Sequence, residues 1–460
     1  MGKIHRLFEH VGLRKYFINT SWLMGEQVLR MLANLVVGIY VARYLGPLHF
    51  GELSFSLSFC ALFSHIVFLG LDGVVVRELV SKPSRHGELL GTSLILKLLS
   101  GFLTLAFVVS IVQSIQMTEV ERWMICIISG SFIFQSVTVI SFYFQAAVKG
   151  KALAGAQLFQ LGLTSLFRIV LVLLEADLIF FAAVALLEIV FVAFALIFNY
   201  RKEIARDKLL AADLTDAGDP VQFNWSVSIS TAKELLRDSW PLMLSGVAIS
   251  VYMKIDQVML RGMLGADAVG QYAAAVRISE AWYLVPVVIV NSLFPAIVNA
   301  KNKDSEVYTL RLQRLYGALI WLGIVVSIIT VMLADLVVSL LFGHAYYEAS
   351  GLLKIHIWAG IFVCVGVAAT KYLIAENYTT ISFVNTLIGA IVNVILNYFL
   401  IPLYGSSAAA FTTVVSYALS AFIMMGVWRL TRDNFFMMSR SAYDVLSIFR
   451  EIDNNKNNSR

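Results

Sequence analysis

Charged residues are scarce in this chain of 460 residues. Asp, Glu, Lys and Arg together make up 14% of it, against about 25% in a soluble globular protein. Hydrophobic residues make up 59%, and the mean hydropathy is +0.79. We therefore expect an integral membrane protein of the all-α class, because a helix satisfies its own backbone hydrogen bonds in lipid.

Signals of catalysis and of cross-linking are also missing. The three cysteines, Cys60, Cys126 and Cys364, lie within apolar segments, so we expect packing residues and no disulfide. The seven histidines lack the spacing of metal ligands, and no nucleophile-elbow, zinc-protease, P-loop or dinucleotide-binding motif stands in a supporting context. We expect no metal site, no catalytic residue and no cofactor, and so a protein that is not an enzyme.

Twelve apolar segments are long enough to cross a bilayer, which requires about 20 residues each. Their approximate ranges are 19–41, 49–71, 89–113, 122–146, 152–174, 178–199, 240–261, 268–298, 314–340, 350–371, 378–402 and 407–429.

Basic residues outside these segments are unevenly distributed. Of the 35 Lys and Arg residues, six lie in the interior of the segments and three in the outer loops or at the segment ends that adjoin them (Arg43, Arg122 and Arg261), which leaves 26 on the side of the termini. The positive-inside rule then places both termini in the cytoplasm. The net charge of +5 follows from this bias, so we expect no nucleic-acid partner.

The longest polar stretch divides the chain into two halves of six spans. We expect an N-terminal bundle, a cytoplasmic linker, a C-terminal bundle and a cytoplasmic tail, over 1–199, 200–238, 239–430 and 431–460. In each half, an S-W pair is followed at nearly the same distance by an L-G-x4-G motif, at Leu45–Gly51 and Leu264–Gly270. We expect these glycines to allow tight turns and close helix approach. Two parallel six-helix bundles, related by a pseudo-two-fold axis along the membrane normal, would follow.

Six basic side chains lie inside the apolar segments: Arg30, Lys97, Arg168, Lys254, Arg277 and Lys354. A charged residue at the bilayer centre costs about 2.5–3.5 kcal/mol, so some of them should face something other than lipid. A hydrated cavity lined by cations predicts a transporter of an anionic substrate. Arg168 and Lys354 could extend to the surface. We expect the other four, Arg30, Lys97, Lys254 and Arg277, to bind substrate.

Acidic residues accompany these cations. Glu26 precedes Arg30 by four positions and Glu280 follows Arg277 by three, so each pair shares a helix face. Asp256 is two positions from a lysine and lies on a different face. We expect Glu26, Asp256 and Glu280 to pair with the basic residues when substrate leaves, or to take up a proton. The alternative is that the pairs are structural and join helices.

Two amphipathic segments flank the bundles, at Val74–Ser84 and Phe435–Ile452. Both mix apolar and basic residues. We expect them to lie along the inner membrane surface, attracted to anionic lipid, so membrane lipid is an expected partner.

Three segments carry a family resemblance. They are RYLGPLHFGELSFSLSF at Arg43–Phe59, SWPLMLSGVAISVYMKIDQVML at Ser239–Leu260, and LGADAVGQYAAAVRISEAWYLVPVVIVNSLFPAI at Leu264–Ile297. They are similar to the polysaccharide flippase family of the multidrug/oligosaccharidyl-lipid/polysaccharide exporter superfamily. The resemblance covers essentially the whole chain, and its most specific parts are K-I-D-Q at 254–257 and R-I-S-E at 277–280.

The resemblance implies a flippase of the bacterial inner membrane. Such a protein moves undecaprenyl-pyrophosphate-linked oligosaccharide units from the cytoplasmic to the outer leaflet by alternating access. The units supply O-antigen of lipopolysaccharide, capsule or exopolysaccharide assembly, so a polysaccharide polymerase complex is a further expected partner. The resemblance also implies coupling to protons or sodium ions.

Two other functional classes stay open. A cation-coupled multidrug antiporter of the same superfamily would need an excess of deep acids, whereas the deep acids here do not outnumber the deep basic residues. A membrane-embedded glycosyltransferase or ligase acting on lipid-linked sugars would need acids or a metal, usually with a sizeable outer domain. The outer loops here are short.

Overall fold

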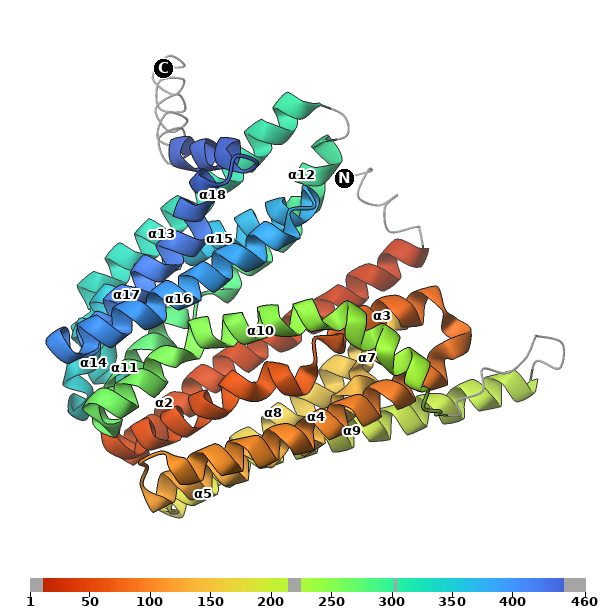
Figure 1. The fold of residues 1–460 in the computed structure, drawn as a ribbon, viewed down its shortest axis with the longest axis horizontal. Coiled ribbons are helices and arrows are strands. Elements are labelled where there is room, and N and C mark those ends of the chain that lie inside the picture. Colours follow the sequence, from red (N-terminus) through yellow and green to blue (C-terminus); the bar gives the residue numbers. More distant parts are fainter. Residues whose placement is uncertain (1–10, 214–224, 302–303, 442–460) are drawn as a thin grey trace, which may run out of the picture. The chain divides into compact units, whose positions relative to one another are not determined.

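The computed structural model describes residues 11–213, 225–301 and 304–441, and all regular structure within these ranges is helical (Figure 1). The expected all-α class is thereby confirmed. Part of the expected linker, 214–224, and the expected tail beyond residue 441 lie outside the described residues.

The helices follow one another along the chain with short connections. The first half holds α2 (Val11–Phe68), α3 (Leu71–Ser81), η1 (Pro83–Arg85), α4 (His86–Ser114), α5 (Glu119–Ser129), α6 (Ser131–Phe134), η2 (Gln135–Val139), α7 (Ile140–Ala146), α8 (Gly150–Leu173) and α9 (Leu178–Asp213). The second half holds α10 (Ile229–Leu264), α11 (Ala266–Glu280), α12 (Leu284–Lys301), α13 (Ser305–Phe342), η3 (His344–Tyr346), α14 (Tyr347–His356), α15 (Ala359–Ala375), α16 (Thr379–Tyr404), α17 (Ser406–Ala418), η4 (Leu419–Ile423) and α18 (Met424–Val427).

Within the described residues, ten helices are long and apolar enough to cross a membrane, or eleven if the bent pair α14 and α15 forms one span. This is fewer than the twelve spans expected. The difference arises because α2 runs through two expected spans, 19–41 and 49–71, and is counted once. A break at Gly46, with φ of 68°, separates the two parts of α2.

The chain forms two compact units. Unit 1 comprises Met1–Tyr44 and Ser56–Ser250, and unit 2 comprises Leu45–Phe55 and Val251–Arg460. The unit boundaries therefore fall inside α2 and α10, whereas the sequence suggested halves separated by a linker. The first half of α10 packs with unit 1 and its second half with unit 2.

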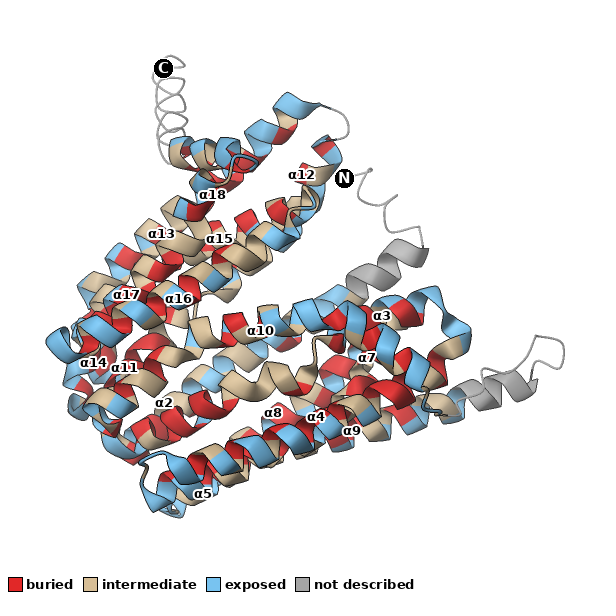
Figure 2. Cartoon of the chain, viewed as in Figure 1, coloured by how far each residue is buried: buried red, intermediate tan, exposed pale blue. Residues whose placement is uncertain are grey.

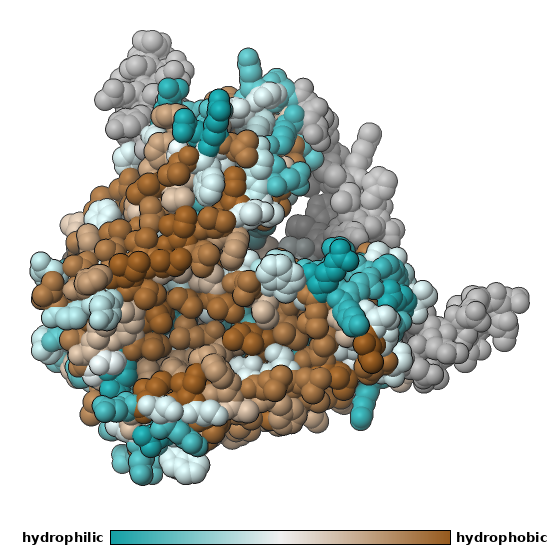
Figure 3. All heavy atoms as spheres, viewed as in Figure 1, coloured by the Kyte–Doolittle hydropathy of each residue, from teal (hydrophilic) through white to brown (hydrophobic). Residues whose placement is uncertain are grey.

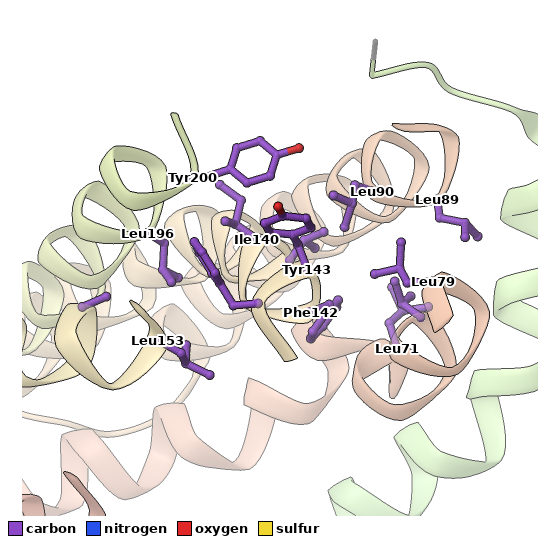
Figure 4. Packing of buried hydrophobic residues seen from close by; sticks show 14 of the residues in the cluster. Leu71, Leu79, Leu89, Leu90, Ile140, Phe142, Tyr143, Leu153, Leu196 and Tyr200 are labelled. Carbon is purple, nitrogen blue, oxygen red and sulfur yellow. The ribbon is translucent and has the colours of Figure 1, made fainter. Parts of the chain in front are cut away.

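Each unit has its own hydrophobic core. The core of unit 1 gathers side chains from α3, α4, α7, α8 and α9, among them Leu71, Leu90, Phe142, Tyr143 and Leu196 (Figure 4). That of unit 2 gathers side chains from α12, α13 and α15, among them Val290, Leu312, Tyr316, Cys364 and Leu373. Along the helices of both units, buried and exposed residues alternate (Figure 2). The visible outer faces of these helices are largely hydrophobic (Figure 3), as expected for helices in contact with lipid.

The apolar face of the first amphipathic segment is covered by protein. Val74, Val75 and Leu79 of α3 are buried in the core of unit 1, so this face packs against protein and not against the membrane. The basic residues pair with the start of α10: Arg77 lies 2.6 Å from Asp238, and Lys82 lies 3.2 Å from Glu234. Hydrogen bonds to acidic side chains raise the pKa of Lys82.

The repeated L-G-x4-G motifs meet each other inside unit 2. The first glycine of each motif, Gly46 or Gly265, adopts a positive φ at the start of a helical segment. The second glycines make reciprocal contacts: a Cβ on Gly51 would collide with the backbone carbonyl of Ala266, and a Cβ on Gly270 with that of Pro47. The expected tight turns and close helix approach are confirmed.

Substitution of these glycines gives a stability prediction. We expect Gly51→Ala and Gly270→Ala to destabilise the protein by about 1–3 kcal/mol each, because a methyl group would force two backbones apart. The control variants are Gly25→Ala and Gly262→Ala, whose added Cβ would meet no atom. The measurement is the Tm of the detergent-purified protein. Equal Tm values for all four variants would contradict the close contact.

Candidate functional site

Within the apolar helices of unit 1, polar side chains are linked by hydrogen bonds into a chain, here called the polar chain. It begins with Glu26 and Arg30 of α2. The Nε of Arg30 lies 2.6 Å from Oε1 of Glu26, as their spacing predicts. The Glu26 residue is only 4% exposed, whereas the Arg30 side chain is 31% exposed. Arg30 also donates from Nη1 to Gln160 of α8, at 3.4 Å.

The chain continues through α8 and α9. Gln160 donates from Nε2 to Glu188 at 2.9 Å, and Arg168 donates to the other oxygen of Glu188 at 2.9 Å. Two cations and two carboxylates therefore alternate across three helices, joined by one neutral amide. This arrangement balances its own charge and joins the helices, which is the structural alternative considered for Glu26 and Arg30.

Lys97 of α4 is fully buried in unit 1. Its ammonium donates to Oγ1 of Thr138 at 2.9 Å. The rings of Phe68 and Phe142 lie 4.7 and 5.1 Å from the nitrogen, which adds cation–π attraction. In this structure Lys97 has no exposed surface with which to contact a ligand, so the structure offers no support for its expected role in substrate binding.

In unit 2 the most enclosed acid is Asp256 of α10, which is 3% exposed. It accepts hydrogen bonds from Tyr272 of α11 at 2.8 Å, from Asn397 of α16 at 2.5 Å and from Thr413 of α17 at 2.6 Å. Asn397 in turn contacts Asn393 and Thr412. The carboxylate is thus surrounded by hydroxyl and amide groups from three further helices.

The donors to Asp256 are all neutral. Burying a carboxylate without a paired cation is costly, and three hydrogen bonds offset part of that cost. The hydroxyl oxygens of Tyr272 and Thr413 and the carboxylate itself are of the kind that hard cations prefer, whereas Asn397 presents its amide nitrogen. This arrangement can hold either a proton or a small monovalent cation. In the described part of the chain, no group of three or more His, Cys, Asp or Glu residues could hold a metal ion.

Lys254 and Glu280 lie near Asp256 but in a different environment. Lys254 is partly exposed, and it has no hydrogen bond or ion pair to any described residue. Its charge and that of Asp256 both act electrostatically on Glu280. The expected difference between positions 254 and 256 is confirmed: the acid is enclosed among helices and the lysine is not.

Arg277 of α11 contacts aromatic residues. Its guanidinium lies 5.3 Å from the ring centre of Phe50, and its charge acts on Tyr346, whose ring packs 6.3 Å from that of Phe50. Arg277 is partly exposed. The face of the Phe50 ring offers the guanidinium a cation–π contact.

The remaining deep cation, Lys354, pairs with Asp335 at 2.7 Å at an exposed position. Lys354 therefore reaches the surface, as its position in the sequence allowed. Arg168 instead pairs with Glu188 inside unit 1.

Sequence reasoning overlooked several polar residues of these sites. They are all neutral, so charge in an apolar segment does not single them out: Gln160, Tyr272, Asn393, Asn397 and Thr413. One signal was present: Asn393 and Asn397 are four residues apart in an apolar helix, so they share one face.

Comparison with known proteins gives two family models and a curated relative. A model described as "Polysaccharide biosynthesis protein" matches residues 17–301, and a MatE model matches residues 241–399. The capsular polysaccharide biosynthesis protein CapF of Staphylococcus aureus is 23% identical over 212 residues, which cover 43% of this chain and 50% of CapF. The chain thus spans about half the length of the curated relative it matches.

Solved structures show the same fold. An inward-facing multidrug resistance MATE family transporter of the MOP superfamily has a TM-score of 0.65 at 16% identity, with 89% of this chain and 96% of that chain covered. The lipid II flippase MurJ, in an inward closed conformation, has a TM-score of 0.58 at 13% identity, with 95% and 92% covered.

The environment of Lys97 predicts the outcome of its replacement. Lys97→Met keeps the length of the side chain and removes a buried charge, a change that is often neutral or stabilising. Thr138 keeps its hydrogen bond to the carbonyl of Gln135. We expect the Tm of the variant to stay within about 2 °C of the wild type, a shift of about 1 kcal/mol at most for a chain of this size. A much larger loss would show that the ammonium holds α4 in place.

Proposed function

Because the chain belongs to the polysaccharide biosynthesis protein family, we propose that it is a flippase that moves lipid-linked oligosaccharide units across the bacterial inner membrane. The family resemblance noted in the sequence is confirmed, and the chain is a multi-pass membrane protein. In this proposal, undecaprenyl-pyrophosphate-linked units pass from the cytoplasmic to the outer leaflet by alternating access, with both termini in the cytoplasm. The protein is a transporter and not an enzyme. The units that it moves to the outer leaflet supply a polysaccharide polymerase.

The observation that carries the proposal is the partial exposure of Lys254 and Arg277, together with the missing ion pair of Lys254. Both are partly exposed on adjacent helices of unit 2, and Lys254 lacks an ion-pair partner among the described residues. A cation inside an apolar helix that is not directly hydrogen-bonded to a carboxylate is costly. An anionic substrate would relieve that cost, because pyrophosphate accepts several charge-assisted hydrogen bonds.

Arg30 fits a secondary role in this proposal. It is partly exposed, but its charge is already balanced by Glu26. A substrate would have to compete with that carboxylate, so we place the main pyrophosphate contact at Lys254 and Arg277. Glu280 interacts electrostatically with Lys254. Its carboxylate would neutralise the charge of the lysine after the substrate has left.

The coupling ion is proposed to act at Asp256. Its carboxylate is enclosed and has only neutral hydrogen-bond donors, so uptake of a proton or a sodium ion would change the local charge from negative to neutral. Since Asp256 and Lys254 are two positions apart on α10, a change at the acid can alter the position of the lysine. This links ion binding to release of the substrate.

A cation-coupled multidrug antiporter is the second candidate, because a MATE transporter shares the fold. The enclosed acid Asp256 would suit either function. The partly exposed basic groups Lys254 and Arg277 favour an anionic substrate. Efflux of cationic dyes from cells that express the protein, abolished in Asp256→Asn, would favour the antiporter.

Loss of the two basic groups tests the substrate proposal. We expect Lys254→Ala and Arg277→Ala each to reduce the surface polysaccharide of a strain that depends on this protein about tenfold or more, since a charge-assisted hydrogen bond contributes about 1.5–3 kcal/mol. Lys354→Ala is the control, because this lysine pairs with an acid at the surface. Protein levels are measured by immunoblot. Normal display in both test variants would remove the proposal.

Replacement of the enclosed acid tests the coupling proposal. Asp256→Asn has nearly the same shape but carries no charge, so transport in proteoliposomes should lose its dependence on a sodium or proton gradient. Asp335→Asn, at an exposed carboxylate, should keep the dependence of the wild type. The readout is the rate of flipping of a fluorescent lipid-linked saccharide with each gradient imposed in turn. An unchanged gradient response in Asp256→Asn contradicts the assignment.

A further inference from the structure

A groove of about 780 Å³ lies between α8 and α9, wholly within unit 1. Its volume is in the range of pockets that hold small molecules. None of its lining residues belongs to the polar chain of unit 1 or to the residues proposed to bind pyrophosphate.

One end of the groove is apolar and open. Phe159 of α8 and Phe194 and Phe198 of α9 are between 51% and 64% exposed. Gly155 also lines the groove, and a Cβ added there would meet no atom within 4 Å. Asn199 donates to the carbonyl of Ala152 at 2.9 Å, which holds the two helices together beside this open space. The space is therefore lined by aromatic rings and a glycine.

The other end of the groove is basic. On α9, Phe194, Phe198, Lys202 and Arg206 follow one another at intervals of four residues, so they form one line along the helix. On α8, Lys151, Gly155 and Phe159 form a similar line with the same interval. The two lines run in opposite directions along the chain, and they bring the basic residues to the same end.

Among the described residues, the charges at this end are not balanced. Lys149 pairs with Glu203 at 2.7 Å, which uses the one acid of the lining. Lys202 and Arg206 are exposed and have no hydrogen bond or ion pair to any described residue. The contact seen for Lys151 is a cation–π approach to Trp22, at 5.5 Å. Three basic side chains are thus available to an anion.

We propose that this groove binds one anionic phospholipid of the membrane. The phosphate contacts Lys202, Arg206 and Lys151, and an acyl chain lies over Gly155 between the phenylalanine rings. A soluble anion would not account for three exposed aromatic rings, and a neutral lipid would not account for three cations that have no acidic partner among the described residues. With the proposed orientation of the termini, the lipid belongs to the cytoplasmic leaflet, which carries anionic headgroups.

The test is native mass spectrometry of the full-length, detergent-purified protein with phosphatidylglycerol or phosphatidylethanolamine added. We expect the wild type to retain one phosphatidylglycerol in preference to phosphatidylethanolamine. In the double variant Lys202→Ala/Arg206→Ala, phosphatidylglycerol should bind about thirtyfold more weakly, since each basic residue near an anionic headgroup contributes about 1 kcal/mol. Equal binding of the two lipids to the wild type, or full binding of phosphatidylglycerol to the double variant, would overturn the proposal.

A matched pair of glycine variants tests the apolar end. Gly155→Leu places a side chain in the open space, where its Cβ meets no atom, and should reduce the binding of phosphatidylglycerol. Gly162→Leu is the control: this glycine is also on α8, is also exposed and also has nothing within 4 Å of an added Cβ, but it does not line the groove. If both variants bind phosphatidylglycerol equally well, the groove is not the site.

A competition arm identifies the source of the phosphate. Undecaprenyl pyrophosphate is added to wild type loaded with phosphatidylglycerol. Retention of the phospholipid supports the proposal. Displacement in the wild type, together with loss of undecaprenyl pyrophosphate binding in Gly155→Leu, would assign the groove to the carrier lipid instead and overturn the assignment made here.

Discussion

The cost of a charge inside a membrane is the constraint on which the arrangement of this protein depends. A basic side chain in an apolar helix must meet a carboxylate, a hydroxyl, an aromatic ring, water or an anionic ligand. Five of the six deep cations have such a contact within the protein: Arg30, Arg168 and Lys354 with acids, Lys97 with Thr138 and two rings, and Arg277 with Phe50. Lys254 has no hydrogen-bond or ion-pair partner among the described residues.

The two units meet this constraint differently. In unit 1 the charges alternate in sign from α2 to α9 and balance each other, which joins the helices. In unit 2 the enclosed acid Asp256 has neutral donors, and the nearby Lys254 is partly exposed. A separated acid and base can each exchange its own ligand, an ion for the acid and a substrate anion for the base. This separation is what the proposed transport cycle uses.

The sequence predicted the features that depend on local spacing. The pair Glu26 and Arg30 followed from an interval of four residues, and the roles of Gly51 and Gly270 followed from a repeated motif. It could not predict partners on distant helices, such as Gln160 for Arg30 or Thr413 for Asp256, because tertiary packing decides them. The same holds for Lys97, whose burial depends on helices that pack around α4. The structure has fewer separate membrane-crossing helices than the sequence predicted, because α2 continues through a single break at Gly46.

The proposed transport function depends most on the accessibility of the basic groups in unit 2. In a variant with Cys60, Cys126 and Cys364 replaced by serine, single cysteines at positions 254, 277 and 97 can be treated with a charged, water-soluble thiol reagent in membranes. We expect Lys254→Cys and Arg277→Cys to react and to be protected by lipid-linked oligosaccharide, while Lys97→Cys stays unreactive. If Lys254→Cys and Arg277→Cys are as unreactive as Lys97→Cys, these residues do not face an aqueous path, and the proposed transport function is contradicted.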